Sequence, residues 1–338
     1  MLHDKFNLFL ATGTKQYLEF LLTCNVKNVL ISFAYKEPWA LKPLMKWNNV
    51  NLLCDSGAFT AWNLAENKKA EGDPNWKRYL INIDEYSDFI DKHKDIIFRA
   101  VNLDVIPGQQ GQTPSQEEIV QAAEKGWENY LYLKRKGHDT VHVFHQGEPT
   151  EYLDRMINEG CDYIGISPSN DNSDEKKLIW LDHIFRHIAN SKNPKIKTHG
   201  FGVTSRRLVE RYPWFSCDSS SYSLTAAMGS ILTPYGRVYI SDQNKFDPDH
   251  IENKPEQIRD HITKYLMDEI GYPITTMTKT VEEQQETCPS CQNKVLFQVK
   301  TQAYKPRNFA NIIYFLKLQA KVRKEGPNMD FIKQQVLF

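Results

Sequence analysis

Apolar, β-branched runs alternate with amphipathic stretches along most of this chain, and this alternation constrains the fold more than any other feature. The apolar runs occupy residues 29–33, 50–54, 96–103, 141–144, 163–166, 195–199, 214–217 and 237–240. Stretches that predict helices separate several of them, at residues 84–94, 115–136, 151–159, 174–191 and 205–212. Crossovers of this length suit parallel strands. The sequence therefore predicts an α/β fold, a (β/α)8 barrel.

The alternation breaks after Asp242. A polar stretch follows over residues 243–298, and it contains Cys288 and Cys291. Residues 306–324 then predict a helix that begins at a proline and presents apolar positions to the barrel wall. We therefore expect a barrel core over residues 1–242, a small insertion with the cysteine pair over 243–304, and a C-terminal helix over 305–338 that completes the barrel.

Composition excludes several classes of protein. The 42 basic and 42 acidic residues cancel, so bulk charge does not hold a polyanion, and any nucleic acid is gripped locally. No apolar run approaches the roughly 18 residues of a membrane span, and the N-terminus does not resemble a signal peptide. The sequence has no phosphate-binding loop. We expect a cytoplasmic protein with no membrane partner and no nucleotide cofactor.

Three carboxylates follow predicted strands, namely Asp55, Asp104 and Asp218. Strand ends of a parallel barrel share one face, where residues distant in sequence converge. Two carboxylates about 5 Å apart across a sugar can cleave a glycosidic bond through a covalent intermediate, one as nucleophile and one as general acid/base. Asp55 and Asp218 are the candidates for this pair. The alternative is that each aspartate caps a helix or binds loop amides.

Groups near these acids form a complement to guanine. Phe59 is placed to lie against a planar base, and Asp104 can accept from the N1–H and exocyclic amine of guanine. Gln146 and the backbone amide near Gly165 can donate to O6.

Two further strand ends belong to the same predicted binding site. Ser56 lies in the turn that follows Asp55, and His199 and Gly200 end another predicted strand, where glycine lets a ligand approach the backbone. A lone histidine such as His199 is more often structural.

Six motifs at these strand ends resemble, in the same order, the active-site motifs of tRNA-guanine transglycosylases. They are residues 55–59 (DSGAF), Asp104, residues 145–147 (HQG), Gly165, residues 199–202 (HGFG) and residues 217–218 (CD). The resemblance implies a barrel enzyme that exchanges guanine in a polynucleotide for a 7-deazaguanine base. It implies Asp218 as nucleophile and Asp55 as general acid/base. It also implies that Asp104, Gln146 and Gly165 bind the base, with Phe59 stacked on it.

The chain departs from the tRNA enzymes in ways that bear on zinc and on the nucleic acid. Only Cys288 and Cys291 remain of the family's structural zinc site, so zinc needs other ligands, such as His250 or His261, or a partner chain. Serines and a tyrosine at residues 219–223 replace the residues that meet the tRNA backbone. The short, neutral chain looks more like the phage DNA-guanine transglycosylases. This implies that it installs a base such as preQ0 or preQ1 in DNA against restriction, with tRNA as the alternative partner.

Phosphate contacts remain necessary for a polynucleotide, and Arg206, Arg207 and Lys321 are candidates. Each is equally explained as part of a solvated helix face. The target base has to be flipped or single-stranded to reach the barrel mouth. By analogy with the family we expect a homodimer. A barrel nucleosidase or glycosidase, and a non-catalytic guanine-binding relative, stay open as alternatives.

Overall fold

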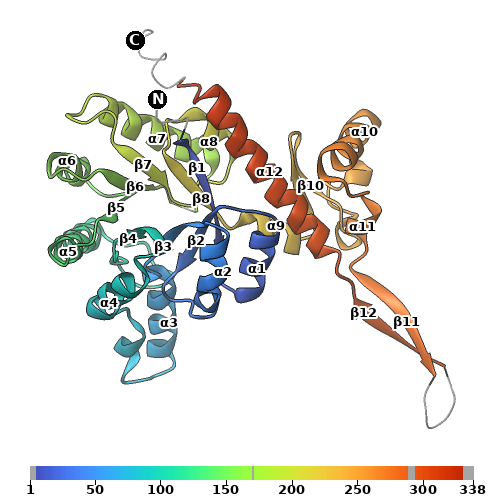
Figure 1. The fold of residues 1–338 in the computed structure, drawn as a ribbon, viewed down its shortest axis with the longest axis horizontal. Coiled ribbons are helices and arrows are strands. Elements are labelled where there is room, and N and C mark those ends of the chain that lie inside the picture. The colour runs from blue at the N-terminus through green and yellow to red at the C-terminus, as the bar shows by residue number, and fades with distance from the viewer. Residues whose placement is uncertain (1–4, 170, 288–293, 330–338) are drawn as a thin grey trace. The chain divides into compact units, whose positions relative to one another are not determined.

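The computed structural model describes residues 5–169, 171–287 and 294–329. Eight parallel strands pair in chain order and close into a barrel, since β8 pairs with β1 (Figure 1). The strands are β1 (Asn7–Thr12), β2 (Asn28–Ser32), β3 (Asn51–Asp55), β4 (Ile97–Val101), β5 (Thr140–His145), β6 (Tyr163–Ser167), β7 (Lys197–Gly200) and β8 (Ser216–Ser219). The structure confirms the predicted (β/α)8 barrel.

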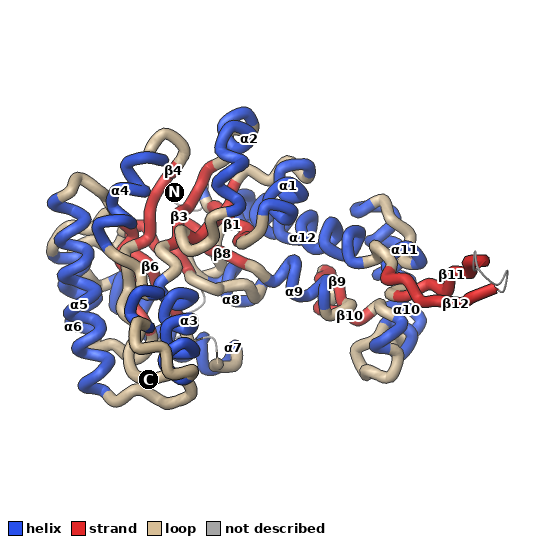
Figure 2. Tube along the Cα trace, turned by 90° about the horizontal axis from the view of Figure 1, so that it is seen from below, coloured by secondary structure: helices blue, strands red, loops and turns tan. Residues whose placement is uncertain are grey.

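Helices connect consecutive strands and lie outside the barrel, as α4, α5 and α6 do in Figure 2. They are α1 (Lys15–Thr23), α2 (Lys42–Trp47), α3 (Ala58–Ala70), α4 (Ile83–His93), α5 (Gln116–Arg135), α6 (Thr150–Asn158), α7 (Asp174–Ala189) and α8 (Arg206–Arg211). Ser115 and Glu118 form a capping box at the start of α5, and Ser173 caps α7. All five helices that the sequence predicted between strands are confirmed, because apolar faces are local signals, as are the side-chain caps of α4, α5 and α7.

The barrel interior is filled by large apolar side chains from successive strands. They are Phe9, Leu30, Leu53, Val101, Val141, Val143, Tyr163 and Phe215. Burial of this cluster is the main stabilising contribution inside the barrel, since apolar surface removed from water contributes about 25 cal/mol per Å². The packed interior leaves the loops at the strand ends to form a site.

The first and last strands of the barrel differ from the prediction. β1 opens the barrel, although residues 7–12 were not among the predicted runs. The run at residues 237–240 does not belong to the barrel, because β10 (Gly236–Tyr239) pairs antiparallel with β9 (Ser230–Thr233). The physical reason is that an apolar, β-branched run identifies a strand but not its partner. Here a short turn between β9 and β10 pairs these two strands as a hairpin.

The chain forms two compact units, residues 1–219 with 319–338, and residues 220–318. These limits differ from the expected 1–242, 243–304 and 305–338. The second unit contains α9 (Ser221–Ala227), β9, β10, α10 (Glu256–Tyr265), α11 (Thr275–Thr278) and a hairpin of β11 (Val281–Thr287) and β12 (Lys294–Lys300). Its core includes Ile231, Ile262 and Leu266.

The C-terminal helix α12 (Tyr304–Glu325) contributes residues to both units. In the barrel unit, Gln319 Oε1 accepts hydrogen bonds from the Leu8 amide (2.7 Å) and from Asn28 Nδ2 (2.8 Å). Arg323 Nε donates to the Phe6 carbonyl at 2.6 Å. The end of α12 therefore lies at the amino ends of β1 and β2. Among the described helices, none combines the length and the apolar character that crossing a membrane requires.

Candidate active site

The three predicted acids lie at the carboxyl ends of their strands. Asp55 is the last residue of β3, Asp218 is the penultimate residue of β8, and Asp104 comes three residues after β4 ends. His145 and Gly200 end β5 and β7. Because all eight strands are parallel, these residues belong to one face of the barrel.

A tight turn fixes Asp55. Its Oδ2 accepts a hydrogen bond from the Gly57 amide at 3.0 Å, just before α3 begins. Gly57 has φ +78°, and a Cβ there would lie 2.4 Å from Ser32 Oγ. Glycine is therefore required for this turn, because a side chain would be strained in the left-handed region and would displace Ser32.

The pKa of Asp55 shows that the acids share one environment. Burial, the charge of Asp104 and the charge of Asp218 raise the pKa of Asp55 from 3.8 to about 6, against the opposing hydrogen bonds from Gly57 and Ser32. A carboxyl group that titrates near neutral pH can both give and take a proton during turnover. This is the property that a general acid/base needs.

Asp218 is held by two donors at the same oxygen. Oδ1 accepts from the Gly202 amide (3.0 Å) and from His199 Nε2 (3.2 Å). The other oxygen, Oδ2, is therefore the candidate to react with a substrate. A carboxylate fixed on one side in this way is oriented before substrate binds.

A buried hydrogen-bonded chain orients His199. Its ring is fully buried, and Nδ1 lies 2.5 Å from Ser216 Oγ, which in turn contacts the Tyr163 hydroxyl. Because Nε2 faces a carboxylate, we assign the proton to Nε2, so that Nδ1 accepts from Ser216 and Tyr163 donates to Ser216. His199, which the sequence predicted as a substrate-binding residue, is fully buried and contacts Asp218.

Asp104 is paired with a charged histidine. His145 Nε2 lies 3.5 Å from Asp104 Oδ2, and His145 Nδ1 lies 2.9 Å from Glu148 Oε1. Burial lowers the pKa of His145, but the hydrogen bonds and charges of Asp104 and Glu148 outweigh it and raise the pKa to about 10. His145 is therefore an imidazolium near neutral pH, and it fixes Asp104 and balances its charge.

The other predicted base-binding groups, Gln146 and Gly165, lie just after β5 and within β6. Gln146 Oε1 accepts from the Ser169 amide (2.9 Å) and from Asn172 Nδ2 (3.2 Å), which fixes the orientation of its own amide NH₂. A Cβ on Gly165 would come within 2.5 Å of the Phe201 ring, so glycine lets this ring pack against β6.

Phe59 is exposed to solvent, whereas Ser56 and Gly200 are buried. The Phe59 side chain is 62% exposed, and its ring stacks on Trp62 with centroids 6.0 Å apart. Ser56 is buried in the turn after Asp55. A Cβ on Gly200 would lie 2.8 Å from Val203 Cγ2, so Gly200 serves close packing below the acids.

The three predicted phosphate contacts have two ion-pair partners, since Arg206 and Lys321 share Glu210 whereas Arg207 pairs with Glu175. Arg206 and Arg207 begin α8, on the strand-end face, and Arg207 is 61% exposed with Glu175 3.2 Å away. Arg206 Nε and Lys321 Nζ both donate to Glu210 Oε1, each at 2.8 Å, so these two cations lie close together.

The predicted zinc ligands Cys288 and Cys291 lie outside the described residues. Within the residues described, no group of three or more His, Cys, Asp or Glu side chains is arranged to hold a metal ion. His250 is buried and its Nδ1 accepts from the Glu252 amide, while His261 stacks on Tyr235. Zinc stays a prediction.

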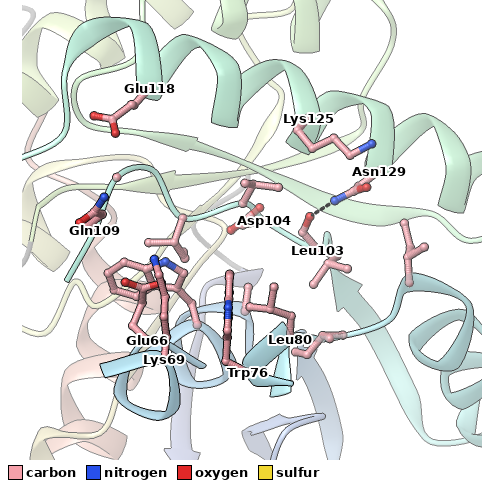
Figure 3. A pocket seen from close by; sticks show the side chains of 17 residues that line it. Glu66, Lys69, Trp76, Leu80, Leu103, Asp104, Gln109, Glu118, Lys125 and Asn129 are labelled. Atoms are coloured by element: carbon pink, nitrogen blue, oxygen red, sulfur yellow. Dashed lines mark hydrogen bonds and ion pairs between the residues drawn. The ribbon is translucent and has the colours of Figure 1, made fainter. Parts of the chain in front are cut away.

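Sequence reasoning missed several residues that contact the site residues, including Tyr163 and Ser216 at the first positions of β6 and β8. Tyr163, Ser216 and Glu148 act through other side chains, and no local pattern marks them. Trp62 and Trp76 line a cavity of about 580 Å³ beside Asp104 (Figure 3). The spacing of Phe59 and Trp62, one turn apart on a helix, was the available signal for a second aromatic surface.

No family profile and no curated protein matches the sequence. Among solved structures, one titled "Structure of L-ribulose 3-epimerase" is similar with a TM-score of 0.38 and 11% identity, over 63% of this chain and 80% of that chain. A similarity this low gives no information on activity.

Proposed function

We propose that this protein is an enzyme that exchanges guanine in DNA for a 7-deazaguanine base, such as preQ0 or preQ1, through a covalent aspartyl-glycosyl intermediate. One observation carries the proposal. Burial, together with the nearby charges of Asp104 and Asp218, raises the pKa of Asp55 to about 6. A carboxyl group that titrates near neutral pH, with a second aspartate near the end of another barrel strand, suits covalent glycosyl transfer, with one acid as nucleophile and the other as proton carrier.

The first half-reaction forms the covalent intermediate. Asp218 Oδ2 attacks C1′ of the target nucleotide, the C1′–N9 bond breaks, and its electron pair leaves on guanine. Protonated Asp55 donates its proton to the departing base, which leaves as neutral guanine. The DNA is then esterified to Asp218 and its phosphodiester backbone is intact.

The second half-reaction reverses these roles. Asp55, now a carboxylate, takes the N9 proton of the incoming 7-deazaguanine, and N9 attacks C1′. The ester bond breaks and Asp218 recovers its electron pair. No nucleoside triphosphate is needed, because the ester keeps the free energy of the glycosidic bond.

Base recognition uses the groups around Asp104. Its carboxylate accepts from N1–H and the 2-amino group, the oriented NH₂ of Gln146 donates to O6, and Phe59 stacks on the ring. His145 supports this role because it holds one Asp104 oxygen through an ion pair.

DNA is favoured over tRNA by the polar residues 219–223 after the nucleophile and by the balanced charge of the chain. The target nucleotide must leave the stack to reach the strand-end acids. Modified guanines in phage DNA would protect it from restriction.

The test is nucleoside mass spectrometry after the protein is incubated with duplex DNA or with tRNA, each with preQ0, preQ1 and labelled guanine. Deazaguanine in DNA alone supports the proposal. Incorporation into tRNA alone would assign the chain to the tRNA enzymes, and release of guanine without incorporation would assign it to hydrolases. Binding of guanine without either reaction would leave a non-catalytic protein.

A further inference from the structure

The cavity beside Asp104 has no role in the mechanism above. Its volume is about 580 Å³, within the usual range of small-molecule sites. Figure 3 shows Glu66, Lys69 and Trp76 on one side, Glu118 and Lys125 of α5 on the other, and Asp104 between them. Because Asp104 lies in its wall, the cavity is continuous with the proposed base-binding site.

The lining suits a flat aromatic molecule. Trp62 and Trp76 offer indole rings, and Leu80, Leu103 and Ile106 add apolar surface. Stacking on aromatic rings holds any nucleobase, because every base has a π-face. The Lys69 ammonium lies 5.1 Å from the Trp76 ring centroid and keeps that ring in place from the open side.

The charges of the lining favour a neutral base over a nucleotide. The lining contains three carboxylates, of Glu66, Asp104 and Glu118, and two ammonium groups, of Lys69 and Lys125. A phosphate would need an excess of positive charge, which this set does not provide. Carboxylates can instead accept from the N–H edges of a free guanine-type base.

We propose that this cavity, the base chamber, holds the free base while the polynucleotide is esterified to Asp218. The inference rests on the proposed function, in which guanine must leave Asp104 before the second base arrives. While the polynucleotide is bound at the strand-end acids, guanine can leave through this cavity and the 7-deazaguanine base can enter through it. Neither step then requires DNA to dissociate. The chamber therefore sets the affinity for the incoming base.

Steady-state kinetics of Trp76→Ala test the chamber, with Trp62→Ala as a second variant that also removes the ring on which Phe59 stacks. We expect the KM for preQ0 to rise about tenfold in each, as expected for the loss of one stacking ring, while the KM for DNA changes less than about twofold. Trp47→Ala is the matched control, since Trp47 in α2 is 84% exposed and outside the chamber. A rise in the KM for DNA instead would mean that a flanking nucleotide occupies the cavity, and unchanged values in both variants would also overturn the proposal.

Equilibrium dialysis of labelled guanine, without any polynucleotide, separates this proposal from the proposed function. If the wild-type protein exchanges no base, yet guanine binding falls about tenfold in Trp76→Ala and not in Trp47→Ala, the chamber stands and transglycosylation is wrong. If the wild-type protein and Trp76→Ala bind guanine equally, the chamber is wrong, whatever the exchange assay shows. Circular dichroism of each variant confirms that it is folded.

Discussion

The buried ring of His199 lies 3.2 Å from Oδ1 of Asp218 through its Nε2 atom. The Gly202 amide meets the same oxygen at 3.0 Å. Both contacts use backbone or side-chain groups of the segment 199–202, so β7 and its following turn position the acid of β8. In the proposed mechanism, this relationship joins two neighbouring strand ends and leaves Oδ2 of Asp218 for attack.

Asp218→Asn should abolish base exchange, with a loss of at least about 10³-fold, because the amide cannot form the ester. The Asn Oδ1 can still accept from Gly202 and His199, so we expect the variant to fold and to bind guanine. Intact-protein mass spectrometry should show a DNA adduct in the wild-type protein incubated without a second base, and none in the variant. Full exchange by the variant would exclude Asp218 as nucleophile.

Asp55→Asn should stabilise the protein at pH 8. The pKa of Asp55 is raised from 3.8 to about 6 in the folded state, so its ionised form costs up to about 3 kcal/mol above pH 6. The folded state binds more protons than the unfolded state between pH 3.8 and 6, so this cost fades as the pH falls through that window. Urea unfolding should therefore show a gain at pH 8 that shrinks at pH 5, while exchange activity is lost. An equal gain at both pH values would contradict this assignment.

His145→Gln should weaken the protein more at pH 6 than at pH 10.5. A pKa raised from 6.5 to about 10 provides stabilisation that is complete below pH 6.5 and lost as the pH rises through 10. Because the side chain is 36% exposed, solvent screens the ion pairs, and we expect about 1 kcal/mol. His142→Gln is the control, since burial lowers the pKa of His142 to about 3 and it stays neutral across this range. A pH-independent effect at His145 would show that it is uncharged.

Arg207→Ala should weaken binding to single-stranded DNA and reduce the salt slope of log K by about 1, because it removes one exposed cation near the strand ends. Lys321→Ala should change both less, because Lys321 is only 35% exposed and is paired with Glu210, which also binds Arg206. Fluorescence anisotropy over a series of salt concentrations measures both variants. The reverse ranking would place the nucleic acid on the face of α12.

Local signals determined much of this protein. The alternation of strand and helix patterns predicts the barrel, and apolar runs that end in Asp55, Asp104 and Asp218 predict a shared acidic face, because parallel strands leave their carboxyl ends together. Caps and apolar spacing also predict the helices between strands. These features depend on a few consecutive residues, which a sequence displays directly.

Only the tertiary structure decided which elements pair and what the side chains contact. It placed residues 236–239 in a hairpin and residues 7–12 in the barrel, since strand pairing depends on long-range closure. It brought Ser216 to His199, His145 to Asp104, and Lys321 to Glu210. Distances between residues far apart in the chain set pKa values and ion pairs, and no spacing within the sequence encodes them.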